Sequence, residues 1–134
     1  METLNPLSLT NAFSHLIAQV AIAPSSARLA AVSGQVAIDS EGRLVGGDDH
    51  AAQAKQCFRN VFNALSAMNA DPKDILQMKI YVVGHSPDLV PAIFGAGADI
   101  FGLKWPVCAS SWICVEALAM PEWLAEIEVL VALP

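Results

Sequence analysis

The stretch WLAEIEVLVAL, residues 123–133, decides the architecture because its side chains divide into two unlike faces. In a β-strand, successive side chains point to opposite sides of the sheet. The odd-numbered positions from Trp123 to Val131 are all apolar, and we expect them to lie against helices. The even-numbered positions carry Glu126 and Glu128 among aliphatic residues. We expect this second face to meet water or another subunit.

The first predicted helix supplies a cover for the apolar face. It begins after Gly46-Gly47-Asp48-Asp49, where either aspartate can cap it, and it ends before Asp71-Pro72. Its apolar residues recur at the spacing of one helical face: Ala54, Phe58, Val61, Phe62, Leu65 and Met68. We therefore expect this face to pack on a sheet.

A second helix is predicted over about Asp88–Phe101. Pro91 is tolerated only in the first turn, which favours Asp88 over Ser86 as the cap. Gly95 and Gly97 weaken the interior by about 1 kcal/mol each relative to alanine. Their presence indicates that the helix packs closely on the sheet, or only that this part of the helix has little side-chain volume.

Short β-rich runs between these helices predict the other strands. We predict a hairpin that joins residues 16–22 to residues 29–35, and a second hairpin that joins residues 107–116 to the terminal strand. Residues 75–83 form the strand between the two helices. The resulting order, ββαβαββ, predicts an α+β sandwich with a mixed sheet and both helices on one face.

Composition limits the class of protein. The 134 residues suit a single domain, residues 1–134. The chain is 54% hydrophobic and 15% charged, so it has more apolar surface than one small chain can easily bury. Part of that surface should therefore be buried against other subunits. The net charge of −6, from 7 basic and 13 acidic residues, predicts no binding to nucleic acid.

Targeting and metal signals are weak throughout the chain. No apolar run approaches the roughly 18 residues of a membrane span, and residues 1–10 do not resemble a signal peptide, so we expect no membrane association and a cytoplasmic location. The three cysteines, Cys57, Cys108 and Cys114, are expected to be buried thiols. The histidines show no metal motif, and no metal is expected.

Several local sequences occur together in a recognisable order. They are Phe13-Ser14-His15, Val32-Ser33-Gly34-Gln35-Val36, Gly46-Gly47-Asp48, Gln53-Ala54-Lys55-Gln56 and Leu124-Ala125-Glu126-Ile127-Glu128-Val129. This set resembles the YjgF-like family, also called the reactive intermediate deaminase or Rid family. The resemblance covers nearly the whole chain. It implies a chorismate-mutase-like fold and a homotrimer with three clefts between neighbouring subunits.

The resemblance also implies a changed ligand site. Deaminases of the family bind the carboxylate of a small imine or enamine acid through an arginine in a Pro-Ala-Arg-Ser segment. Cys108-Ala109-Ser110-Ser111 takes that place here, with Ser110 at the arginine position and Cys108, or Pro106 after a small shift, at the proline position. A serine offers one neutral hydrogen bond where a guanidinium offers a charge-assisted pair. An uncharged, hydroxyl-bearing or aromatic ligand is therefore expected.

Glu126 matches the family's water-positioning glutamate. A carboxylate on a mostly apolar face should have a raised pKa, which suits general acid or base chemistry. The alternative is an interface glutamate that binds backbone amides or serines. Substrate-binding positions carried over by the resemblance are Gly34, Phe13, Phe94, Ser110, Ser111, Trp112 and, more distantly, His15. Ordinary core or interface packing, or a surface position for His15, is the competing interpretation.

These observations lead to a principal and an alternative function. The first is a divergent Rid-family enzyme that needs no cofactor and transforms a small reactive metabolite by hydrolysis or proton transfer through Glu126. The alternative is a trimer that binds a small ligand, or acts as a chaperone, without catalysis. A 2-imino acid deaminase of the family's usual kind and a ribonuclease are weaker alternatives.

Overall fold

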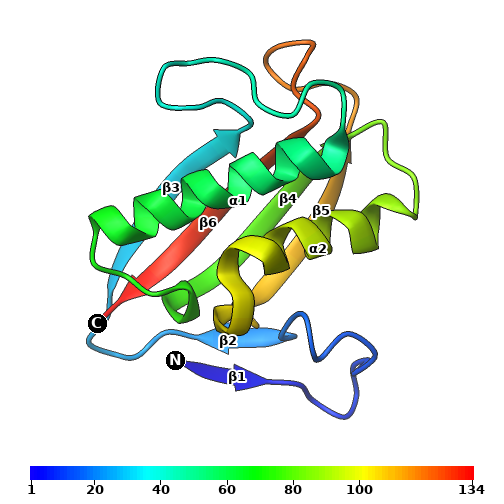
Figure 1. The fold of residues 1–134 in the computed structure, drawn as a ribbon. Helices are drawn as coiled ribbons and strands as arrows, with labels where there is room; N and C mark the ends of the chain where they lie inside the picture. Colours follow the sequence, from blue (N-terminus) through cyan, green and yellow to red (C-terminus); the bar gives the residue numbers. More distant parts are fainter.

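Four strands form a mixed sheet in the computed structural model, which describes residues 1–134 (Figure 1). Their order across the sheet is β3 (Arg28–Val36), β6 (Ala125–Leu133), β4 (Ile75–Val83) and β5 (Ala109–Val115). Strand β6 pairs antiparallel with both of its neighbours, whereas β4 and β5 run parallel. Strand β6 therefore lies inside the sheet, and β3 and β5 form its edges.

Two helices, α1 (His50–Ala67) and α2 (Leu89–Phe101), cover one face of this sheet (Figure 1). The Asp49 carboxylate caps α1 by accepting a hydrogen bond from the Ala52 amide at 2.7 Å. Asp88 precedes α2 as predicted, but its side chain makes no capping hydrogen bond. Two short 3-10 helices, Pro72–Asp74 and Gly102–Lys104, follow α1 and α2. The α+β architecture with both helices on one face is confirmed.

The two faces of β6 differ as its sequence predicts. The side chains of Ala125, Ile127, Val129 and Val131 are at most 4% exposed beneath the helices. Glu126 and Glu128 alternate with them and are only partly buried on the opposite face. Each fully buried aliphatic side chain contributes about 1.5–3 kcal/mol. The hydrophobic effect therefore determines which face of the sheet the helices cover.

Both predicted hairpins are wrong. Strand β2 (Val20–Ile22) pairs with an additional strand, β1 (Glu2–Leu4), in a separate two-stranded sheet, and β3 pairs with β6 instead. Strand β5 pairs in parallel with β4 and does not contact β6 as a neighbour. Alternating apolar residues identify the buried face of a strand but not its partner. The apolar strand β6 buries the most side-chain surface when it has a neighbouring strand on each side.

Gly97 packs closely and Gly95 does not. A Cβ atom added at Gly97 would lie 2.6 Å from the Trp105 ring and 2.9 Å from the Phe58 ring, whereas one at Gly95 would meet nothing within 4 Å. The close contact is therefore with α1 and Trp105, not with the sheet as predicted. Phe58 contacts Phe101 edge to face at 5.6 Å, so Gly97 lets α2 approach an aromatic cluster.

Two further expectations are corrected by the burial of side chains. Cys57 and Cys108 are buried, and burial raises the pKa of their thiols to about 12 and about 11, but Cys114 is exposed. Phe62, assigned to the core face of α1, is 39% exposed at the edge of that face.

Neither helix combines the length and apolar character needed to cross a bilayer. No cluster of three His, Cys, Asp or Glu side chains is arranged to hold a metal.

The paired glycines of α2 give a matched test of this packing. Gly97→Ala should lower the free energy of unfolding by about 1–3 kcal/mol, because its methyl group would overlap the rings of Phe58 and Trp105. Gly95→Ala should raise the same quantity by about 0.5–1 kcal/mol, because alanine favours the helix and the space is open. Urea denaturation of both variants measures the difference. Equal effects at the two positions would contradict the packing described.

Candidate functional site

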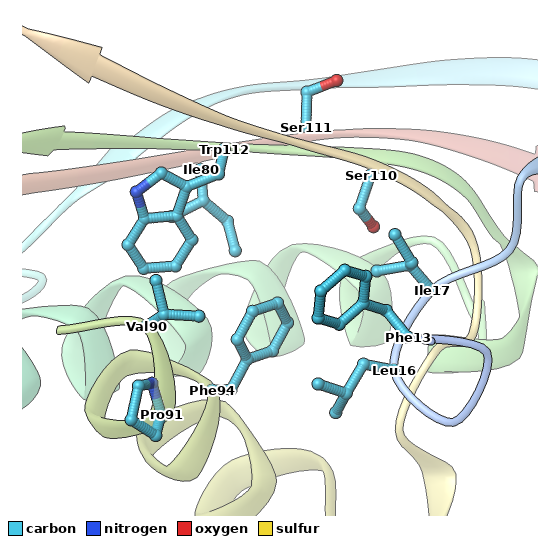
Figure 2. Close-up of a pocket in the computed structure, with 10 residues that line it drawn as sticks. All are labelled: Phe13, Leu16, Ile17, Ile80, Val90, Pro91, Phe94, Ser110, Ser111 and Trp112. Carbon is cyan, nitrogen blue, oxygen red and sulfur yellow. The ribbon is translucent and has the colours of Figure 1, made fainter. Parts of the chain in front are cut away.

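A cavity of about 300 Å³ lies between α2, the edge strand β5 and the segment that precedes β2 (Figure 2). Most of its lining side chains are apolar, and none is charged. The lining residues are Phe13, Leu16, Ile17, Ile80, Val90, Pro91, Phe94, Ser110, Ser111 and Trp112. Ligand sites are commonly concave, mostly apolar and supplied with few polar groups. This cavity is therefore the candidate ligand site.

The N-terminal segment is fastened to the sheet and forms one wall of the cavity. The Ala18 amide donates a hydrogen bond to the Cys108 carbonyl at 2.9 Å, which joins the segment to the start of β5. The Trp105 indole N–H donates to the Leu16 carbonyl, also at 2.9 Å. These two bonds position Leu16 and, three residues earlier, Phe13. The wall is therefore attached to the fold although Phe13 itself is 55% exposed.

Aromatic rings connect the cavity to the core. Phe94 stacks on Trp112 with ring centroids 6.0 Å apart and planes 28° apart, and it contacts Trp105 at 5.5 Å. Trp105 in turn contacts Phe58, which is completely buried. Such offset and edge contacts are favourable arrangements of aromatic rings. The α2 and β5 walls are consequently held by the same packing that stabilises the core.

Polar groups at the cavity are few. Figure 2 shows the Ser110 hydroxyl directed toward the cavity and the Ser111 hydroxyl directed away from it. The Ser110 hydroxyl donates to the Cys108 carbonyl at 3.2 Å. The Trp112 indole N–H donates to Nδ1 of His85 at 3.2 Å. The cavity can enclose an uncharged molecule and offers no charged partner to an ion.

The acidic groups of β6 lie on the other face of the sheet. Tyr81 donates a hydrogen bond to Glu128 at 2.5 Å, and the Lys79 ammonium lies 3.5 Å from the same carboxylate oxygen. This hydrogen bond is the main cause of the raised pKa of Tyr81. Burial, followed by repulsion from Glu128, raises the pKa of Glu126. Glu126 therefore holds its proton more readily than an ordinary glutamate and has no basic partner.

Gly34 leaves space for the Glu126 carboxylate. Strand β3 has a register shift between Val32 and Gln35, and Gly34 lies within it. A Cβ atom added at Gly34 would lie 1.8 Å from Oε1 of Glu126. The backbone does not have a positive φ at this position. Close approach to the carboxylate, not backbone conformation, is therefore the reason for glycine.

The predicted site residues separate into two groups. Five of the predicted ligand-binding residues line the cavity: Phe13, Phe94, Ser110, Ser111 and Trp112. Gly34 and Glu126 lie together on the opposite face, and His15 is exposed outside the cavity lining. Sequence reasoning missed the aliphatic lining of Leu16, Ile17, Ile80 and Val90, and it treated Pro91 only as a residue of the first helical turn. Nothing in the sequence distinguishes these residues from core residues.

Comparisons with known proteins agree with this architecture. The family model described as endoribonuclease L-PSP matches residues 8–133. The crystal structure of YyfB from Yersinia pestis, a protein of unknown function in the conserved Rid family, is similar to the chain at 36% identity. The match covers 98% of each chain with a TM-score of 0.87. No curated protein matches the chain.

Two other solved structures are similar over most of the chain. Rv2704 from Mycobacterium tuberculosis, of the YjgF/YER057c/UK114 family, is 28% identical over 78% of this chain and 79% of its own, with a TM-score of 0.61. E. coli TdcF with bound serine is 20% identical over 86% of this chain and 92% of its own, with a TM-score of 0.68. The TdcF comparison supports the fold alone.

The raised pKa of Glu126 predicts how stability depends on pH. The carboxyl loses its proton at higher pH in the folded chain than in the unfolded chain, so wild-type stability should fall as pH rises above the ordinary glutamate pKa of about 4.3. Glu126→Gln removes the destabilisation that ionisation of this carboxyl causes in the folded chain. Its free energy of unfolding should therefore increase relative to wild type between pH 4 and pH 7.5, as measured by urea denaturation. The exposed Glu116→Gln control changes net charge equally and should show a smaller trend.

Proposed function

Because the chain belongs to the endoribonuclease L-PSP family, which includes the YjgF-like or Rid proteins, we propose that it is an enzyme for a small, reactive metabolite. The metabolite is uncharged or aromatic, and Glu126 transfers the proton during hydrolysis or isomerisation. The observation that carries this proposal is the cavity of about 300 Å³ with aromatic walls and no charged lining residue. No cofactor is required for this chemistry.

The lining of the cavity supports an uncharged substrate. A carboxylate is best recognised by a bidentate, charge-assisted pair with arginine. The chain has only three arginines, Arg28, Arg43 and Arg59, and none of them lines the cavity. Ser110 provides a single neutral hydroxyl there. A carboxylate-bearing imine is therefore a poor substrate for this site.

Participation of Glu126 requires a neighbouring subunit. Within one chain the carboxylate lies on the open face of the sheet, whereas the cavity lies beside α2 and the edge strand β5. We propose a homotrimer in which the open face of one subunit meets the cavity edge of the next. The partly buried Leu130, which shares the open face with the carboxylates, supports this arrangement. No helix covers that face (Figure 1).

Imine hydrolysis illustrates the chemistry assigned to Glu126. The carboxylate removes a proton from water as the oxygen bonds to the imine carbon, and the carbon–nitrogen π electrons move to nitrogen. Glu126 then gives its proton to that nitrogen, which becomes an amine. The carboxylate next takes the proton of the new hydroxyl group and passes it to the amine as the carbon–nitrogen bond breaks, which releases ammonia and leaves a carbonyl compound. A raised pKa suits this exchange, because a carboxyl that holds its proton more readily can both accept and return one.

A non-catalytic trimer that holds a small ligand, or acts as a chaperone, is the second candidate function. The observation that favours it is the separation of Glu126 from the cavity in the single chain. A ribonuclease is disfavoured, because the net charge is −6 and the open face carries Glu126 and Glu128 where a phosphate backbone would need cations. We propose no nucleic-acid partner.

Substitution of Glu126 distinguishes the enzyme from the binding protein. Glu126→Gln should reduce kcat/KM for an uncharged imine by about 100-fold or more, as expected for loss of a general acid or base. The substitution should leave ligand affinity and the trimer, measured by light scattering, unchanged. Wild-type kcat/KM should fall as pH decreases through the raised pKa of Glu126. Undiminished turnover by the variant would exclude this role for Glu126.

Gly34→Ala tests the same role without removing the carboxylate. The new methyl group would overlap Oε1 of Glu126 and should displace the carboxylate from its position. We expect kcat to fall while KM changes little, because Gly34 does not line the cavity. Glu116→Gln serves as the activity control. If wild type binds ligands tightly but turns none of them over, the non-catalytic function is the correct one.

A further inference from the structure

One hydroxyl group, that of Ser110, is directed into the cavity, and its hydrogen atom already takes part in a hydrogen bond within the protein. The Ser110 hydroxyl donates to the Cys108 carbonyl at 3.2 Å. The Cys108 thiol lies 3.5 Å from the same hydroxyl oxygen and remains neutral, because burial raises its pKa to about 11. A hydroxyl oxygen has two lone pairs, so at least one is left for the cavity. Ser110 therefore presents an acceptor to a ligand.

The other polar side chain of the lining is also engaged. The Trp112 indole can only donate, and it donates to Nδ1 of His85 at 3.2 Å. The Ser111 hydroxyl points away from the cavity (Figure 2). Among the lining side chains, none then offers a free hydrogen-bond donor to a ligand. A molecule that carries only acceptors, or a negative charge, loses hydrogen bonds to water and regains none from these side chains.

Aromatic surface reaches the cavity from three different elements. Phe13 comes from the N-terminal segment, Phe94 from α2 and Trp112 from β5 (Figure 2). The Phe94 and Trp112 rings are stacked, with planes 28° apart and centroids 6.0 Å apart. A cavity of about 150 Å³ accommodates benzene, so about 300 Å³ suits one or two fused rings. Flat rings gain specific contacts with such walls.

We infer that the cavity binds a neutral aromatic molecule of one or two rings that donates an N–H or O–H hydrogen bond to Oγ of Ser110. This inference rests on the proposed small-molecule function and specifies the class of ligand. It differs from recognition of a carboxylate, because the contact reverses the direction of the hydrogen bond and involves no charge. Phenols, anilines and indoles have the required combination of a flat apolar body and one donor.

Titration calorimetry with two molecules of nearly equal shape tests the inference. Indole donates one N–H hydrogen bond, whereas benzofuran carries an oxygen at that position and donates none. Wild-type protein should bind indole about fivefold more tightly than benzofuran, the factor expected for one net hydrogen bond. Benzoate, an anion of similar width, should bind more weakly than either of them.

Two serine variants connect this preference to Ser110. In Ser110→Ala the indole and benzofuran affinities should become equal, whereas Ser111→Ala, whose hydroxyl points away, should keep the wild-type preference. Circular dichroism confirms that each variant is folded. If Ser110→Ala does not fold, the wild-type comparison of indole with benzofuran decides the question.

Different failures identify different errors. Equal wild-type affinities, or a preference that persists in Ser110→Ala, would overturn the inference and leave the proposed apolar site in place. Tighter binding of benzoate would overturn both the inference and the uncharged substrate proposed above. If no aromatic molecule binds, the inference and the ligand site both fail. If Glu126→Gln loses turnover while the wild-type protein shows no preference for indole, the catalytic proposal stands and the present inference fails.

Discussion

Strand β6 has to bury one row of side chains completely while it keeps two carboxylates near water. Its odd-numbered aliphatic residues are at most 4% exposed from Ala125 to Val131, and Glu126 and Glu128 occupy alternating positions on the other face. Burial of an unpaired carboxylate costs far more than burial of an aliphatic side chain gains. Both helices therefore pack on the same face. This asymmetry fixes the side of the sheet on which the hydrophobic core lies.

The cavity forms where that helical cover reaches the edge of the sheet. Strand β5 has a partner on one side only, and α2 and the N-terminal segment approach it without closing over it. The walls are nevertheless held firmly, because the rings of Trp112, Phe94 and Trp105 lead from the cavity to the buried Phe58. Gly97 permits this arrangement by leaving space for two of these rings. A site supported by core packing is largely preformed.

The asymmetry of β6 also separates the apolar cavity from the Glu126 carboxylate. Glu126 and Gly34 belong to the open face, whereas Ser110 and Trp112 face the cavity beside the helices. A single chain does not bring these two groups together. The proposed catalysis by Glu126 on a cavity ligand would therefore require the proposed assembly of subunits. The proposed catalytic function therefore depends on the proposed oligomeric state.

Local pattern alone determined the first helix, strand β4 and the two faces of β6, because each depends on the direction of successive side chains along one element. The resemblance of short motifs also grouped Phe13, Phe94, Ser110 and Trp112, which line one cavity. Only the tertiary structure decided which strands pair, which aliphatic residues complete the cavity and that Glu126 lies apart from it. These features depend on contacts between distant segments, and an apolar residue has the same appearance in sequence whether it lines a core or a ligand site.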